Sequence, residues 1–288
     1  MGHIAIVTDT TASIPEPLLE KYQIRTVPYY IHRGKETLRD LVTISRAAFY
    51  SWLPTATELP KTASPGPGDY FELYNQLATQ ENVDEIISIH MTSKGSGAYQ
   101  AALCGKEMAE EQHPNLAIQV VDTLNVSMCQ GWIALESARA VLEGLSYTTI
   151  LDRIQRMIPK VRMIQTADTL HYLYLGGRIG RAKHLVGSLL NIKPLISMED
   201  GLIVALGTAR SRMKAYQRMA KLVESAVGGM GRIKIAYVHA AAADEVLKIK
   251  ELVEARVNVV ESLIAELSPA LGVHSGPGTV GFCFYPVE

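Results

Sequence analysis

The sequence has few cysteines and no long hydrophobic run, and each shortage excludes a class of protein. Its three cysteines, Cys104, Cys129 and Cys283, are far apart and form no Cys-x-x-Cys pair, which favours buried thiols in a reducing cytosol over a redox or metal site. No apolar run approaches the ~20 residues of a transmembrane helix, and the N-terminus lacks the pattern of a signal peptide. We therefore expect a cytoplasmic protein without an integral membrane segment.

An excess of charge of either sign is also absent. The 28 basic and 29 acidic residues give a net charge of −1, which argues against nucleic acid as a partner. The sequence contains no H-E-x-x-H motif, no glycine-rich P-loop and no spaced acidic cluster, so we expect no metal site. What is present is a large apolar fraction, 48% of 288 residues, which is enough for a sizeable core and two compact domains.

Residues 1–160 alternate predicted strands with predicted helices. The strands are short apolar runs, and they cover residues 4–8, 25–31, 85–90 and 117–122. One intervening helix is predicted to begin near Pro15, where Ser13 and Glu16 have the spacing of a capping box. This alternation is typical of a three-layer α/β domain with a mostly parallel sheet.

The pattern changes over residues 161–288, where we expect an α+β domain with a mixed sheet. Strands at 194–198 and 202–206 flank Glu199-Asp200-Gly201, a favourable hairpin turn. They are followed by a helix at 211–226, a strand at 233–238, a helix at 244–256 and strands at 259–265 and 280–285. Pockets favour the seam between two domains, so we expect a ligand between these halves.

The segment Met91-Thr92-Ser93-Lys94-Gly95-Ser96-Gly97 is the most informative loop of the chain. It lies between a β-branched run that predicts a buried strand and a segment that predicts an amphipathic helix. Small hydroxylated residues at a helix N-terminus offer hydroxyls, free backbone N–H donors and the positive end of the helix dipole. The loop is therefore suited to hold a phosphate or a carboxylate, and Ser93, Ser96 and Gly97 are candidate binding residues.

Three further segments are unusual for plain connections. The hydroxyl of Thr62 lies in a proline-stiffened turn, Arg178 is set among glycines, and His274 precedes a rigid Ser-Gly-Pro-Gly turn. Each has an ordinary interpretation as well: a loop before a helix, a surface arginine beside a helix cap, and a structural histidine. The residues alone leave these alternatives open.

Enzyme templates match the sequence poorly. The G-x-G-x-x-G of residues 276–281 is followed by too few residues for a helix, and Gly95-Ser96-Gly97 lacks the third glycine of a dinucleotide site. A serine hydrolase or acyltransferase would use Ser93 or Ser96 with His274, but neither serine is in a G-x-S-x-G elbow. That enzyme stays open as an alternative.

Together these segments resemble the DegV family of bacterial fatty-acid-binding proteins, and the resemblance covers essentially the whole chain. Five ordered motifs carry it. Residues 7–12 are similar to the opening V-T-D-S-T-A, 62–65 to the turn T-S-Q-P, and 92–100 to S-S-x-L-S-G-T-Y-Q. Residues 174–179 resemble Y-L-x-K-G-G-R-I with one residue fewer, and residues 274–278 match the closing His-x-Gly-Pro-Gly.

The resemblance implies an N-terminal α/β domain and a C-terminal domain with a long acyl chain buried between them. In the family, the carboxylate is held by the threonine of the T-S-Q-P turn and the second serine of S-S-x-L-S-G, which fall on Thr62 and Ser93. The arginine of G-G-R and the histidine before Gly-Pro-Gly fall on Arg178 and His274, and both are expected near the head group.

The resemblance also implies a carrier rather than an enzyme. Family members present a bound long-chain fatty acid to a separate fatty acid kinase subunit, which is dihydroxyacetone-kinase-like. That kinase makes the acyl phosphate for phospholipid synthesis. We therefore expect no catalytic residue, no metal and no cofactor besides the bound fatty acid.

Four residues depart from the family pattern. Ala63, Gly66, Gly95 and Ala98 replace residues that are usually hydroxylated or larger. The loss of a leucine at Gly95 is expected to widen or loosen the pocket wall. Acyl length and unsaturation are therefore left undetermined, and a carrier of another acidic amphiphile stays an alternative.

Overall fold

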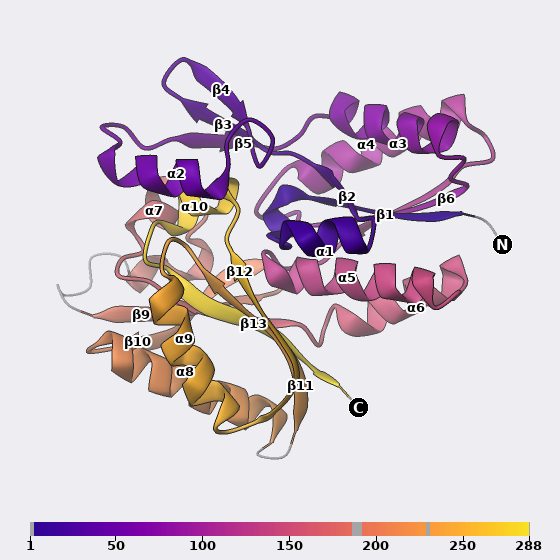
Figure 1. Ribbon diagram of the computed structural model, residues 1–288. Coiled ribbons are helices and arrows are strands. Elements are labelled where there is room, and N and C mark those ends of the chain that lie inside the picture. Colours follow the sequence, from indigo (N-terminus) through magenta and orange to yellow (C-terminus); the bar gives the residue numbers. More distant parts are fainter. Residues whose placement is uncertain (1–2, 186–191, 229–230, 288) are drawn as a thin grey trace.

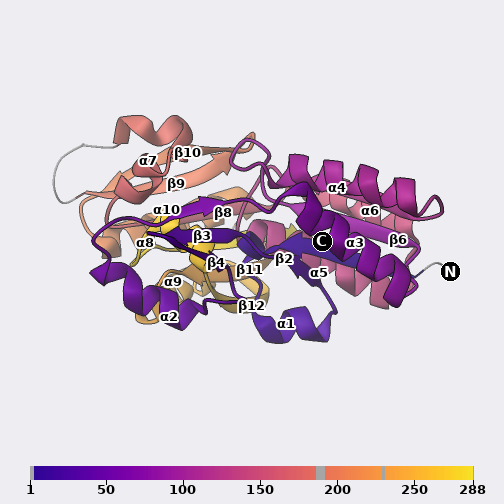
Figure 2. The same ribbon diagram turned by 90° about the horizontal axis from the view of Figure 1, so that it is seen from above.

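A parallel sheet and a mixed sheet organise the chain. The computed structural model describes residues 3–185, 192–228 and 231–287 (Figure 1). The two sheets lie side by side, with their helices around them (Figure 2). The predicted fold class is confirmed, because an α/β part with a parallel sheet precedes a part with a mixed sheet.

The parallel sheet has the strand order β2-β1-β6-β7 and is covered on both faces. Its strands are β1 (Ile4–Asp9), β2 (Arg25–Val27), β6 (Glu85–His90) and β7 (Ala117–Asp122). Their β-branched runs suit burial on both faces. One face is covered by helices α3 (Pro67–Gln80) and α4 (Ala98–Gln112), and the other by α5 (Met128–Leu142) and α6 (Tyr147–Met157). The three predicted layers are therefore present.

The mixed sheet has the order β10-β9-β8-β13-β11-β12 and is antiparallel except between β11 and β12. Its strands are β8 (Arg162–Thr166), β9 (Lys193–Glu199), β10 (Leu202–Ala209), β11 (Arg232–His239), β12 (Asn258–Glu266) and β13 (Val280–Val287). Helices α8 (Arg212–Val227) and α9 (Ala243–Glu254) pack on one of its faces. The predicted hairpin between β9 and β10 forms, with Asp200 and Gly201 at positive φ as its tight turn requires.

Helix α5 is shared by the two sheets. It contacts β1 of the parallel sheet and β13 of the mixed sheet, and most of its residues are buried. The buried Trp132 donates a hydrogen bond from its indole Nε1 to the carbonyl oxygen of Cys283, at 3.1 Å. One hydrophobic core therefore continues from the parallel sheet through α5 to the mixed sheet.

A small antiparallel sheet of order β4-β3-β5 is absent from the sequence predictions. It consists of β3 (Tyr30–Arg33), β4 (Glu36–Arg39) and β5 (Lys61–Ala63), with α2 (Arg46–Trp52) after β4. From α2, Arg46 and Tyr50 donate hydrogen bonds to backbone carbonyls that precede α10 (Pro269–Ser275). This part of the first 160 residues thus packs on the second half of the chain. The division at residue 160 stays a prediction.

Two local predictions in this region are wrong. The predicted strand at 25–31 is two strands in different sheets, β2 and β3. Pro28 lies between them, and it both lacks an N–H for a ladder and restricts the backbone of Val27. The predicted turn at Thr62 is instead the strand β5, in which Thr62 pairs with Ile31 of β3.

Helix α1 (Glu16–Lys21) begins next to Pro15, as predicted, but without the predicted capping box. Ser13 has a left-handed backbone, and its hydroxyl oxygen accepts a hydrogen bond from the N–H of Ser268. Pro15 precedes the helix and supplies no side-chain cap, so the capping-box prediction is wrong. The remaining short elements are the 3-10 turns η1 (Thr10–Ala12), η2 (Leu53–Thr55) and η3 (Gly180–Leu185), and helix α7 (His171–Leu175).

Candidate binding site between the sheets

A cavity of about 370 Å³ lies where the parallel sheet meets the mixed sheet. Loops that follow the carboxyl ends of β1, β6 and β7 form one wall, at Thr11, Ser96 and Ser127 among others. Strands β8, β9 and β10, with residues of α7 and α10, form the other wall. Ligands of open α/β sheets bind outside the carboxyl ends of strands, and this volume is typical of small-molecule sites.

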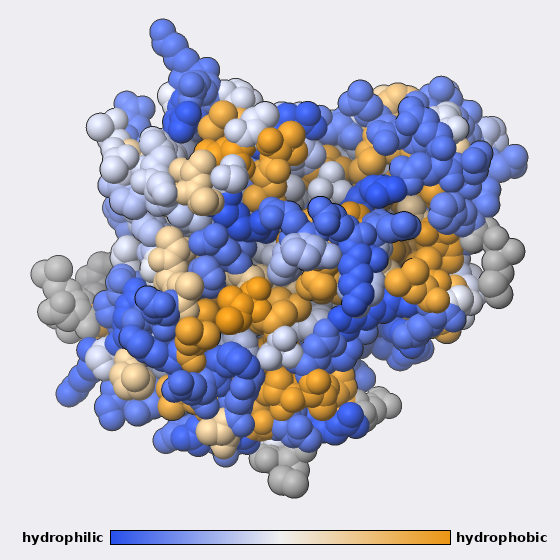
Figure 3. Space-filling model, in the orientation of Figure 1, coloured by the Kyte–Doolittle hydropathy of each residue, from blue (hydrophilic) through white to orange (hydrophobic). Residues whose placement is uncertain are grey.

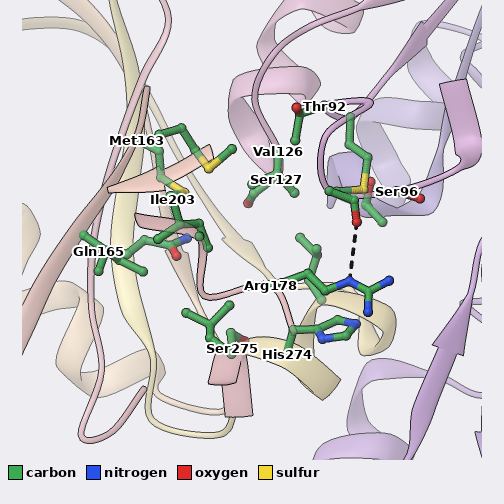
Figure 4. A pocket seen from close by; sticks show the side chains of 18 of the residues that line it. Thr92, Ser96, Val126, Ser127, Met163, Gln165, Arg178, Ile203, His274 and Ser275 are labelled. Atoms are coloured by element: carbon green, nitrogen blue, oxygen red, sulfur yellow. Dashed lines mark hydrogen bonds between the residues drawn. The ribbon is translucent and has the colours of Figure 1, made fainter. Parts of the chain in front are cut away.

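Much of the cavity wall is apolar. Methionines and aliphatic residues contribute from both halves of the chain: Met91, Val126, Met163, Leu170, Leu173, Ile196, Met198, Leu202, Ile203, Leu267 and Leu271. Met163 and Ile203 lie together at one side of the cavity in Figure 4. Such a wall suits an apolar ligand, because each buried methylene group contributes about 0.8 kcal/mol.

Thr62 and His274 form the centre of a polar end. The Thr62 Oγ1 of β5 and the His274 Nε2 of α10 share a hydrogen bond of 2.7 Å. The buried Nδ1 of the same ring has no hydrogen-bond partner among the described residues. Burial, and then the nearby Arg178 guanidinium, lower the pKa of His274 to about 4. The ring is therefore neutral at pH 7.

The glycine-rich turn after α7 positions Arg178 beside this histidine. A Cβ on Gly176 would overlap the His274 ring, so the close approach requires glycine there. Gly177 has φ +70°, a conformation that glycine adopts without strain. Arg178 donates to the carbonyl oxygens of Gly176 at 2.6 Å and Gly95 at 3.4 Å, and the latter bond is drawn in Figure 4.

Ser96 and Gly97 face the cavity at the start of α4. The Ser96 hydroxyl shares a hydrogen bond of 2.6 Å with the hydroxyl of Tyr29. Burial, and next the charge of Asp9, raise the pKa of Tyr29 well above its usual range, so the phenol is neutral. The sequence analysis missed Tyr29, which follows the carboxyl end of β2. Its position could have indicated it, because residues that directly follow the strands of a parallel sheet often line a binding site.

Ser93 does not lie with the other predicted residues. Its side chain is exposed and is not part of the cavity wall, and its N–H donates to the Asp122 carboxylate at 3.2 Å. The adjacent Thr92 lines the cavity instead, and its hydroxyl donates to the carbonyl oxygen of Gly201 at 2.9 Å. The structure thus brings together Thr62, Ser96, Gly97, Arg178 and His274 but places Ser93 outside.

The described residues pair His274 with neither of the serines proposed for hydrolysis, since its bonded partner is Thr62. An Asp9–His90–Ser88 chain does exist, with Nδ1 of His90 at 3.0 Å from Asp9 and Nε2 at 2.7 Å from Ser88. All three side chains are fully buried in the parallel sheet, and none lines the cavity. These three hydrogen-bonded residues therefore belong to the interior of the parallel sheet and not to the binding site.

The sequence predictions also concerned metal sites and membrane-spanning helices. Within the described residues, no group of three or more histidine, cysteine or acidic side chains is arranged to hold a metal ion. None of the described helices combines the length and apolar character needed to span a bilayer. The face shown in Figure 3 is largely hydrophilic, with smaller hydrophobic patches.

Comparison with known proteins identifies the family. A model of the DegV family, described as an uncharacterised protein family, matches residues 3–287. The chain belongs to the DegV family. A DegV domain-containing protein from Halalkalibacterium halodurans is 32% identical over 287 residues, which cover 99% of both chains. Protein DegV from Bacillus subtilis is 31% identical over 283 residues, covering 98% of this chain and 99% of that one.

Solved DegV structures share this fold. A DegV family protein from Thermus thermophilus, described by its fatty acid binding, has a TM-score of 0.90 at 30% identity and covers 99% of this chain and 100% of its own. DegV from Bacillus subtilis, described as a fatty acid binding protein, has a TM-score of 0.86 at 30% identity and full coverage of both chains, 100% each. The family expected from the five motifs is confirmed.

Proposed function

We propose that this DegV protein binds a long-chain fatty acid in the cytoplasm and has no catalytic role of its own. The observation that carries the proposal is a cluster of hydroxyl, imidazole and guanidinium groups at one end of a largely apolar cavity. The fatty acid binding described for the related structures supports it. No cofactor or metal is part of the proposal.

The carboxylate is proposed to lie among Thr62, Ser96, Arg178 and His274, near the first amide groups of α4 at Gly97. Because the neutral His274 ring can donate to the Thr62 oxygen, the Thr62 hydroxyl can turn its own proton toward the carboxylate. Arg178 brings positive charge, and the helix N-terminus adds the favourable end of its dipole. Ser96 replaces Ser93 in this set, since only Ser96 lines the cavity.

The acyl chain supplies most of the proposed affinity. A dozen buried methylene groups contribute on the order of 10 kcal/mol, whereas each hydrogen bond to a charged head group adds about 1.5–3 kcal/mol. The polar end therefore selects and orients the carboxylate, while the apolar wall retains the ligand. Flexible methionines in that wall can adapt to chains of different shape.

The experiment is native mass spectrometry of the purified protein, followed by extraction and identification of the bound molecule. We expect one fatty acid per chain. Thr62→Val and Ser96→Ala should weaken its retention about tenfold, because each removes a hydrogen bond to a charged group. Ser93→Ala is the matched control and should retain the ligand fully, since this serine is exposed and outside the cavity.

Two outcomes contradict the proposal. A cavity that is empty after purification and also rejects added fatty acids would exclude the ligand class. If fatty acid retention falls in Ser93→Ala but not in Thr62→Val or Ser96→Ala, the carboxylate binds at the outer side of the loop and not in the cavity.

The proposed role is to present the bound acid to a separate, dihydroxyacetone-kinase-like fatty acid kinase subunit, which forms the acyl phosphate used in phospholipid synthesis. In that step a carboxylate oxygen attacks the γ-phosphorus of ATP and ADP leaves. The exposure of Arg178 beside the polar end supports the role, because the carboxylate must be reachable from outside. Incubation of the loaded protein with the kinase and ATP should yield acyl phosphate, and failure with an active kinase would contradict the role.

A further inference from the structure

A second set of polar groups faces the cavity away from the carboxylate end. In Figure 4, Ser127 and Gln165 lie across the cavity from Ser96, Arg178 and His274, next to Met163. The proposed fatty acid would place its acyl chain along this side. A saturated chain offers neither a donor nor an acceptor to these groups, so their presence there requires a reason.

Gln165 faces the cavity because of the alternation of strand β8. Met163 and Gln165 of β8 line the cavity, while Ile164 between them packs into the core on the other face. Gln165 is buried, with 7% of its surface exposed, and no described residue is bonded to its side-chain amide. The strand therefore presents an amide to the cavity beside the apolar side chain of Met163.

Ser127 is the residue before α5 and is 1% exposed. It has a positive φ of 59°, which is unusual for a residue with a side chain. Its hydroxyl does not cap the helix and has no hydrogen-bond partner among the described residues. Other N-cap serines of the chain, such as Ser45 and Ser211, accept a bond from the first turn of their helices.

Two neighbouring threonine hydroxyls in the cavity wall are satisfied within the protein. Thr166 donates to the carbonyl oxygen of Pro194 at 2.7 Å, and Thr279 donates to that of Ser275 at 2.7 Å. The Ser275 hydroxyl, beside His274 in Figure 4, also lines the cavity and has no partner among the described residues, so the unpaired polar groups of the wall include Ser275 as well as Ser127 and Gln165. Buried polar groups without a partner are rare in native proteins, and a ligand is one way to satisfy them.

We propose that the preferred ligand is a fatty acid whose chain carries an oxygen, as a hydroxyl or an oxo group, beyond the carboxylate. This inference rests on the proposed fatty acid binding and narrows its ligand class. The Ser127 hydroxyl and the Gln165 amide donate hydrogen bonds to that oxygen, and the Gln165 carbonyl accepts the proton of a ligand hydroxyl. Of the departures from the family pattern, Gly95 lines the opposite, carboxylate side of the cavity and is not part of this argument.

The test is a set of binding measurements with octadecanoate and its 10-hydroxy, 12-hydroxy and 10-oxo derivatives. We expect at least one oxygenated acid to bind about tenfold more tightly than octadecanoate, since it satisfies groups that the plain chain leaves unpaired. In the double variant Ser127→Ala and Gln165→Leu this preference should fall below about twofold, because the two proposed donors are removed. Ser137→Ala is the control: this buried serine of α5 bonds to the carbonyl oxygen of Ile133 away from the cavity.

The outcomes separate this inference from the proposed function. If octadecanoate binds at least as tightly as every oxygenated acid, the protein carries plain fatty acids and the inference is wrong. A preference that survives in the double variant also contradicts it. If none of the four acids binds, both the inference and the proposed fatty acid binding fail. Thermal unfolding of each variant shows whether the fold is retained, and single substitutions replace the double variant if it is not.

Discussion

At the scale of single residues, two buried ionisable groups depart from their usual behaviour in opposite directions. His274 stays neutral in the polar end of the cavity, and Asp40, between β4 and α2, is fully buried with Thr10, Ser268 and the backbone of Ala270 near its carboxylate. Burial of each group makes folding stability depend on pH. Stability falls at low pH because of the base His274 and at high pH because of the acid Asp40.

The histidine effect appears on acidification. The pKa of His274 is lowered from 6.5 to about 4, so between these values the unfolded chain takes up a proton that the folded protein refuses. Stability should therefore fall as the pH drops through this window, by up to about 3 kcal/mol. Urea unfolding at several pH values measures it. His274→Gln should flatten the dependence, whereas the exposed His171→Gln should not; equal slopes in both would contradict the assignment.

The aspartate effect has the reverse sign. Burial raises the pKa of Asp40 from 3.8 to about 6, so the folded protein holds this proton at a higher pH than the unfolded chain does. Stability should fall as the pH rises through this window, and above it Asp40→Asn should be more stable than the parent by about 1–3 kcal/mol. The exposed Asp152→Asn is the control. A destabilised Asp40→Asn at pH 8 would show that the carboxylate is needed in ionised form.

At the scale of elements, the length and pattern of a segment decide whether it was predictable. The strands β1, β6 and β7 of the parallel sheet are apolar runs of six residues, the helices α4, α8 and α9 are longer segments with helical periodicity, and the predictions found them. The small sheet was missed because its strands have three or four residues each and are partly exposed. The switch between sheets at Pro28 depends on tertiary pairing, which local pattern does not contain.

Helix α5 packs against both sheets, and Trp132 is its largest fully buried side chain. Trp132→Ala should lower the free energy of unfolding by about 3–5 kcal/mol, because it removes a large buried ring and leaves the carbonyl of Cys283 unpaired. Leu142→Ala on the same helix, where the side chain is 68% exposed, should change stability by less than about 0.5 kcal/mol. Denaturant unfolding measures both, and similar losses for the two variants would contradict the assigned role.

At the scale of the whole molecule, the candidate site combines segments that the sequence keeps far apart. Motif chemistry indicated Thr62, Ser96, Arg178 and His274, and the fold brings them together. The sequence did not reveal that Ser93 turns outward, because the two serines of the loop have the same local chemistry and only the packed loop distinguishes them. Tertiary contacts also place the Tyr29 hydroxyl on Ser96.

The continuous core predicts that both halves unfold together and that the ligand stabilises them as one unit. Hexadecanoate at about 100 times its dissociation constant should raise the free energy of unfolding by about 2.7 kcal/mol. Calorimetry should show one transition that moves to higher temperature as the fatty acid concentration rises. Two transitions, of which only one responds to the acid, would contradict this coupling.

The position of α5 also bears on how a bound molecule leaves. Separating the two sheets would expose the helix that joins their cores, so dissociation by a hinge motion is strongly disfavoured. Helix α7 has no buried residue in its span, although Leu173 within it and Arg178 just after it line the cavity. Release by local displacement of α7 needs far less energy. We therefore expect the dissociation rate of the proposed ligand to be set by the five-residue helix α7.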